Sequence, residues 1–95
     1  MSNFEADRQK VYDHINTLQD RVEACTSLGM KDFGDQKYNE TVDLLDELEE
    51  IRTYPELAEI QLKAQNLERA LNGWLASKGQ TTLAISWPKI PLEEL

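Results

Sequence analysis

Apolar residues recur at helical spacing along most of the chain and predict three helices. In the first helix they follow alternating steps of four and three residues, which places them on one face: Phe4, Val11, Ile15, Leu18, Val22 and Cys25. Ser2 and Glu5 form a capping-box pattern at its start, and Gly29 stands where a glycine often follows a helix end. We therefore expect the first helix over about residues 3–28.

The second helix is predicted over residues 36–52, after a connector from Gly29 to Gly34 and with Asp35 as its N-cap. Its expected apolar face consists of Tyr38, Val42, Leu44, Leu45, Leu48 and Ile51. The opposite face repeats carboxylates three or four residues apart: Glu40, Asp43, Asp46, Glu47 and Glu50. This pattern is typical of a helix with one buried face and one acidic, solvated face.

The third helix is predicted over residues 54–78, because Thr53-Tyr54-Pro55-Glu56 is a capping box with proline in the first turn. A single kinked helix across this point is the alternative. The apolar positions are Leu57, Ile60, Ala64, Leu67, Leu71 and Trp74, and Gly79 ends the pattern. Gly73 costs about 1 kcal/mol relative to alanine inside a helix. We attribute it to a close helix crossing or, alternatively, to a local helix end at Asn72.

Three such helices predict an all-α protein: an antiparallel three-helix bundle over residues 1–79, or a helical hairpin that oligomerises. The first and third helices are expected to be longer than the second, so part of their apolar seams would stay uncovered in a monomer. A 95-residue chain also buries a modest fraction of its surface. These points, together with the apolar C-terminal tail of residues 80–95, lead us to expect a homo-oligomer.

Residues 80–95 break the helical pattern and are predicted to form an extended, proline-containing C-terminal tail. Pro88 and Pro91 lack a backbone N–H and disfavour helix in the residue before them. Leu83, Ile85 and Trp87 are spaced two residues apart, as in an extended segment. The apolar side chains of this tail have to be buried against the chain's own helices, a sister subunit or a foreign partner.

Composition and charge exclude several classes of function. The formal net charge is −8, residues 35–56 alone sum to −6, and no cluster of lysine and arginine is present. Direct nucleic-acid binding is therefore not expected. The mean hydropathy of −0.60 argues against a membrane protein, and the N-terminal residues do not resemble a signal peptide. The single cysteine, Cys25, excludes an internal disulfide and fits a reducing cytoplasm.

No combination of residues indicates catalysis. The sole histidine, His14, has no nucleophile or second base at a spacing that a helix brings together. Cys25 lies in an apolar seam near a helix C-terminus, which predicts a buried structural thiol. The carboxylates of the second helix are expected to point outward from a convex surface without converging on a cation. We therefore expect no enzyme, metal site or cofactor.

The leading interpretation is a small acidic, non-enzymatic, cytoplasmic protein that binds and inhibits or adapts another protein. By analogy of size and charge alone, phage-encoded inhibitors of host or defence proteins are of this type. The expected contacts are acidic residues of the second helix and apolar residues of the tail: Glu40, Asp43, Glu47, Glu50, Ile85, Trp87 and Ile90. A merely solvated face and a DNA-mimicking row of carboxylates are the alternatives for the acidic residues.

Two further hypotheses belong to other classes. The first is an oligomer that binds a small anionic, nucleotide-like ligand, because aromatic and cationic groups mix in one part of the first helix: Arg8, Lys10, Tyr12 and His14. The second is a structural assembly or chaperone protein whose tail swaps between subunits. The sequence leaves the identity of any partner open.

Overall fold

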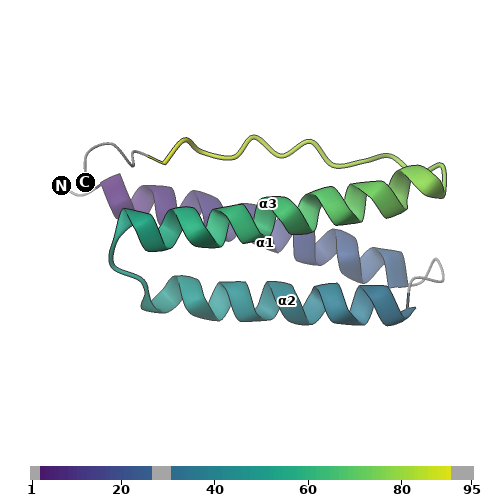
Figure 1. Cartoon of the computed structure of the whole chain (residues 1–95), viewed down its shortest axis with the longest axis horizontal. Helices are drawn as coiled ribbons and strands as arrows, with labels where there is room; N and C mark the ends of the chain where they lie inside the picture. The colour runs from purple at the N-terminus through teal and green to yellow at the C-terminus, as the bar shows by residue number, and fades with distance from the viewer. Residues whose placement is uncertain (1–2, 27–30, 91–95) are drawn as a thin grey trace.

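The computed structural model contains three α-helices and an extended segment that returns along the bundle (Figure 1). It describes residues 3–26 and 31–90, and all of their side chains except those of residues 26 and 31–33. The helices are α1 (Asn3–Thr26), α2 (Lys31–Glu50) and α3 (Tyr54–Ser77). Successive helices run antiparallel and pack on one another, which confirms the predicted all-α three-helix bundle.

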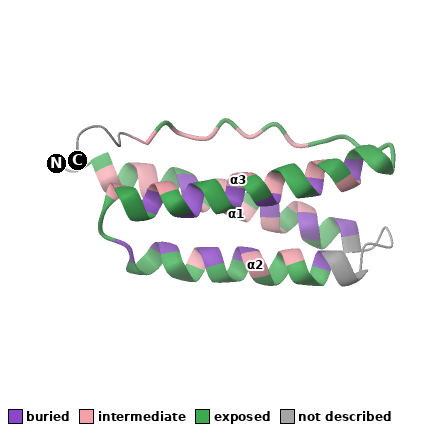
Figure 2. Ribbon diagram, in the orientation of Figure 1, coloured by how far each residue is buried: buried purple, intermediate pink, exposed green. Residues whose placement is uncertain are grey.

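The core is built from the apolar seams of the three helices (Figure 2). The buried apolar residues are Val11, Ile15, Leu18, Val22 and Cys25 from α1, Leu44, Leu48 and Ile51 from α2 and its end, and Leu57, Ile60, Ala64, Leu67, Leu71 and Leu75 from α3. Most of the two longer seams is therefore covered within one chain, although Phe4, at the start of the α1 seam, is only half-buried. In α3 the buried position is Leu75, whereas the predicted Trp74 is half-buried.

One face of α2 differs from its prediction. Tyr38 and Val42, expected in the core, are each 36% exposed, whereas Thr41 is fully buried. The Thr41 hydroxyl donates to the Tyr38 carbonyl at 2.6 Å and accepts from Gln19 Nε2 of α1 at 3.1 Å. A hydroxyl with both kinds of partner is satisfied in the interior, which explains a polar residue at this position.

The start of α2 was predicted wrongly. Residues 31–34 are helical, so the expected connector to Gly34 and the expected N-cap at Asp35 are both incorrect. Gly34 is buried and lies seven residues before Thr41, on the same inward face of the helix. Packing on that face outweighs the weak helix propensity of glycine. The expectations for Ser2, for the end of the first helix at residue 28 and for Gly29 fall on residues 1–2 and 27–30, outside the described residues.

The connection between α2 and α3 is short and non-helical, so the single kinked helix is excluded. α2 ends at Glu50 and not at residue 52, and residues 51–53 separate the two helices. Thr53 is the N-cap of α3 and forms the predicted capping box with Glu56. The three-residue connection places the end of α2 beside the start of α3.

The glycine inside α3 and the glycine that follows its end differ. At the helix end, Gly79 has a φ of 69°, Gly79 N–H donates to Ala76 O at 3.1 Å, and Gln80 N–H donates to Leu75 O at 2.9 Å. These bonds form a Schellman motif, which reverses the chain direction. Gly73 lies inside the continuous helix, and a Cβ there would meet nothing within 4 Å. Both expectations for Gly73, a close crossing and a local helix end, are therefore wrong.

The described part of the tail, residues 80–90, is extended and runs antiparallel to α3 along the bundle (Figure 1). Leu83, Ile85, Trp87 and Ile90 pack against the core, and residues 82, 84 and 86 between them are exposed. The predicted alternation of the tail is thereby confirmed. It is the chain's own helices that these apolar side chains cover.

Candidate functional site

Carboxylates line both sides of the surface between α2 and α3. Two adjoining shallow hollows lie there, and both are lined by Glu47 and Lys63. Their other carboxylates are Glu40, Asp43 and Glu50 from the α2 side and Glu56 and Glu59 from α3. We call this surface the acidic groove: Glu40, Asp43, Glu47, Glu50, Glu56 and Glu59. It contains the acidic residues singled out from the sequence and two that were missed.

Few cations offset these charges. Lys63 Nζ of α3 lies 3.6 Å from Glu47 Oε1 and 3.9 Å from Glu59 Oε1, with all three side chains at least 49% exposed. Lys37 Nζ lies 3.0 Å from Glu40 Oε2 at one end of the groove. Among the described residues, Asp43 and Glu50 have no cation within ion-pair distance. The groove therefore keeps a negative field that water and salt screen only in part.

Glu56 is fixed by the local structure of the helix start. Its Oε1 accepts from the Thr53 hydroxyl at 2.8 Å and from the backbone N–H groups of Arg52 and Thr53, each at 3.2 Å. The hydrogen bond from the Thr53 side chain, followed by that from the Arg52 backbone, lowers the pKa of Glu56 below its ordinary value of 4.5. This carboxylate stays ionised and held in one orientation at the end of the groove.

The floor of the acidic groove is apolar. Leu44 and Leu67 lie beneath the hollow between Glu40 and Lys63, and Ile51 and Ile60 lie beneath the neighbouring one. All four side chains are core residues with at most 6% exposure. A guest side chain with an aliphatic stem and a charged end would match such a surface, as lysine and arginine do.

Glu56 and Glu59 were missed because the sequence interpretation treated the acidic face as belonging to one helix. The connection between α2 and α3 is only three residues long. An antiparallel pair joined in this way brings residues just before the turn next to residues just after it. The capping box at Thr53 fixes that turn, so the two added glutamates were within reach of sequence reasoning.

The tail residues proposed as partner contacts lie on the opposite flank of α3. Trp87 Nε1–H donates to Glu68 Oε1 at 2.8 Å, and the Trp87 ring meets His14 edge to face with centroids 5.1 Å apart. Ile85 and Ile90 are half-buried against the core. The structure therefore does not bring these residues together with the acidic groove.

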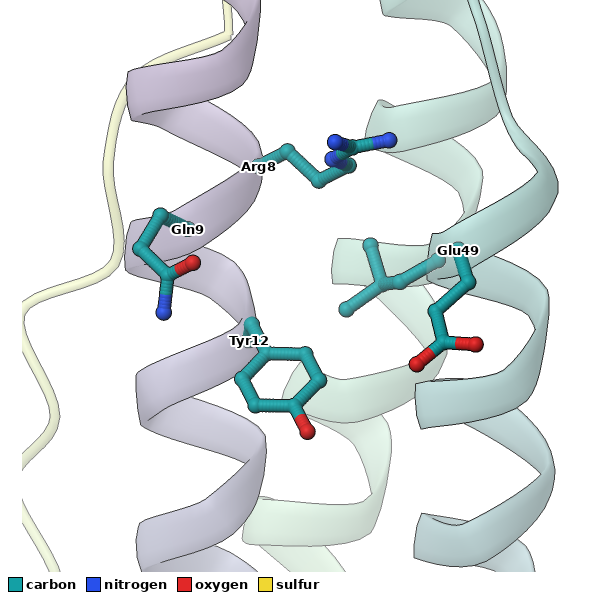
Figure 3. Close-up of a pocket in the computed structure, with 5 residues that line it drawn as sticks. Arg8, Gln9, Tyr12 and Glu49 are labelled. Carbon is teal, nitrogen blue, oxygen red and sulfur yellow. The ribbon is translucent and has the colours of Figure 1, made fainter.

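The four residues of the alternative ligand site are also separated. Arg8 and Tyr12 line a hollow of about 400 Å³ between α1 and α2, together with Gln9, Leu48 and Glu49 (Figure 3). Tyr12 comes from α1 and Glu49 from α2, on opposite walls of this hollow (Figure 3). His14 instead contacts Trp87 of the tail. Lys10 is exposed and does not line the hollow.

Cys25 is 1% exposed and free, which confirms the predicted buried thiol. Across residues 3–26 and 31–90, no group of three or more histidine, cysteine, aspartate or glutamate side chains is placed to hold a metal ion. None of the helices in the same ranges combines the length and the apolar character that crossing a bilayer requires. Comparison of the chain with protein-family models, curated proteins and solved structures finds no match.

Proposed function

We propose that the protein is a non-catalytic binding module whose acidic groove receives a lysine- and arginine-rich segment of a partner protein. The single observation that carries this proposal is the placement of six carboxylates on two helices around one surface, with Lys63 between them and Lys37 at one end. By covering a basic surface, the module would inhibit the partner wherever that surface binds nucleic acid or another acidic ligand. The free Cys25 fits a cytoplasmic location for this activity.

The physical basis is complementary charge. A groove of one sign steers an oppositely charged partner during diffusion and raises the association rate, more so at low salt. Exposed pairs each contribute little, about 0–1 kcal/mol, so several carboxylates acting together are needed. The apolar floor beneath Glu40 and Glu47 adds contact area for the aliphatic stems of the partner's basic side chains.

The test is charge reversal on α2. The variant Asp43→Lys/Glu47→Lys/Glu50→Lys changes three groove residues, two of which have no cation within ion-pair distance among the described residues. We expect partner affinity to fall at least about a hundredfold, because attraction becomes repulsion. Circular dichroism should show unchanged helicity. Partners are the proteins that cross-link to the wild-type chain in lysate of its source cells.

A matched control makes the same change in net charge as the groove variant but places the three reversals on another face. Asp13→Lys/Asp20→Lys/Glu23→Lys alters three exposed residues of α1. The same partners should cross-link to this control and to the wild type, and raised salt should weaken both complexes. If the α1 and α2 variants lose the partners equally, net charge and not the acidic groove determines binding, and the proposal is wrong.

A second candidate function rests on the hollow between α1 and α2. There Arg8 and Tyr12 project from α1 and Glu49 projects from α2 (Figure 3). Such a set suits a small ligand that carries an anionic group and a flat ring. Native mass spectrometry of the purified protein should then show an adduct of small mass. Tyr12→Ala should remove it, whereas Lys10→Ala, outside the hollow, should retain it.

A further inference from the structure

Side chains of α3 hold the backbone of the tail. Asn72 contacts Leu83 twice: its Nδ2 donates to Leu83 O at 2.9 Å and its Oδ1 accepts from Leu83 N–H at 2.8 Å. Glu68 accepts from Ile85 N–H at 3.1 Å and from the Trp87 indole at 2.8 Å. Gln61 Nε2 donates to Pro88 O at 2.9 Å. Through these bonds α3 recognises the N–H and C=O groups of an extended segment, much as the edge of a β-sheet binds an added strand.

The spacing of these contacts explains why the bound segment is extended. Between Asn72 and Gln61 there are eleven helical steps, and between their partners Leu83 and Pro88 there are five steps. Both stretches span about 16 Å, because a helix rises about 1.5 Å per residue and an extended chain about 3.3 Å. α3 therefore presents polar groups in register with an extended peptide whose apolar residues alternate.

The tail is separable from the bundle core. The buried apolar core comes from the helices and Ile51, whereas the tail's apolar side chains are only half-buried at its edge. Beyond Gln80, the described tail makes no backbone–backbone hydrogen bond, and Arg21 Nη2 of α1 contacts Thr81 O at 2.8 Å. Within the backbone, the reversal at Gly79 directs the tail back onto its own groove, where the side chains of α3 and Arg21 hold it.

We propose that the groove between α1 and α3 is a receptor for this tail sequence in trans, and that two copies of the chain exchange tails to form a dimer. The occupant is a second copy, because the groove's polar side chains are matched residue by residue to Leu83, Ile85, Trp87 and Pro88. Exchange opens the reversal at Gly79 but can repeat the side-chain contacts of residues 83–88 in the partner's groove, and it closes with two-fold symmetry. The tail in cis competes at an effective concentration of order millimolar, so the wild-type chain is mostly monomeric at micromolar concentration.

The experiment mixes two full-length variants with complementary defects. The groove variant is Glu68→Ala/Asn72→Ala, which removes four tail contacts from two half-buried helix positions and leaves the tail intact. The tail variant is Leu83→Ala/Ile85→Ala/Trp87→Ala, which leaves the groove intact. The masses differ, so native mass spectrometry distinguishes a heterodimer, near twice 10.9 kDa, from either homodimer.

We expect each variant alone to be monomeric and the mixture to form a one-to-one heterodimer. Wild type mixed with the tail variant should bind at least about tenfold more weakly, because its own tail competes in cis. Two folded variants that remain monomeric when mixed would overturn the proposal. The proposal would also be overturned if the groove variant alone formed homodimers as abundantly as the mixture forms the heterodimer.

A second variant keeps the test decisive if the groove variant fails to fold. Gly79→Val places a β-branched residue at a φ of 69°, which strains the reversal that holds the tail in cis. We expect the dimer fraction to rise about tenfold or more, and the added substitution Trp87→Ala should abolish the dimer. A dimer that persists without Trp87, or no rise at all, contradicts tail exchange.

Discussion

The two flanks of α3 carry similar polar side chains in different surroundings. Towards α1, Glu68 accepts two hydrogen bonds from the tail, and Asn72 makes two more. Towards α2, the Glu59 side chain is 70% exposed and shares the single cation Lys63 with Glu47. Carboxylates of the same helix thus bind the tail on one flank and face solvent on the other. Negative charge that contributes little to folding is where we expect binding.

The substitution with the largest expected effect on this contrast is Trp87→Ala. The change removes a hydrogen bond to Glu68, the edge contact with His14 and a half-buried ring. We expect a loss of about 2 kcal/mol in the free energy of unfolding, from the lost apolar burial and the hydrogen bond. Urea denaturation followed by circular dichroism measures it.

The neighbouring residue provides the control for that substitution. Ser86 is exposed in the same extended segment, so Ser86→Ala should change stability by no more than about 0.5 kcal/mol. Equal effects of Ser86→Ala and Trp87→Ala would mean that the docked tail does not contribute to stability. The distinction between a stabilising flank and a solvated flank of α3 would then be wrong.

A second prediction compares the two flanks with the same substitution. Glu68→Ala leaves the Ile85 N–H and the Trp87 indole without their acceptor and should cost about 1–2 kcal/mol. Glu59→Ala removes a long, exposed contact to Lys63 and should cost less than about 0.5 kcal/mol. Urea midpoints of the two variants give the comparison directly. A larger loss for Glu59→Ala would reverse our assignment of structural and solvated flanks.

The sequence predicted those parts of the fold that depend on local signals. The heptad seams gave the number of helices and most of the core, and the capping box at Thr53 placed the start of α3. The alternation of Leu83, Ile85 and Trp87 gave the extended tail. In each case one short-range rule acts without competition from tertiary packing.

The errors occur where tertiary contacts outweigh local preference. Gly34 was interpreted as part of a connector, but it is buried in α2, where packing compensates for its propensity. Thr41 occupies the core because Gln19 of α1 reaches its hydroxyl, a pairing that no periodicity reveals. The tail's polar partners Gln61 and Glu68 likewise depend on register between segments far apart in sequence.

The next prediction contrasts Gly73, inside α3, with Gly79, just after its end. Gly73→Ala should stabilise the protein by about 0.5–1 kcal/mol, because the added methyl group meets nothing within 4 Å and alanine favours helix. Gly79→Ala should destabilise it by about 1 kcal/mol, because φ is 69° there. Thermal unfolding should shift in opposite directions for the two variants. A loss of stability in Gly73→Ala would mean that another helix does pack closely on Gly73, contrary to the structure.

The smallest expected effect concerns acid at the end of the acidic groove. Hydrogen bonds from Thr53 and Arg52 lower the pKa of Glu56, so the native state binds a proton at this carboxyl less readily than the unfolded state does. The stabilisation is therefore fully present above the ordinary value of 4.5 and is lost as pH falls through the lowered pKa. Glu56→Gln cannot ionise and should show a shallower loss of stability between about pH 6 and pH 3.

Thr53→Ala separates the two causes of that pH dependence. It removes the side-chain hydrogen bond that lowers the Glu56 pKa most, but it keeps the N–H groups of Arg52 and Thr53. Its pH dependence should therefore fall between those of the wild type and Glu56→Gln, as measured by urea midpoints at each pH. If the three profiles coincide, the capping box does not hold this carboxylate in solution. Glu56 would then belong with Glu59 among the freely solvated charges of the α2 flank.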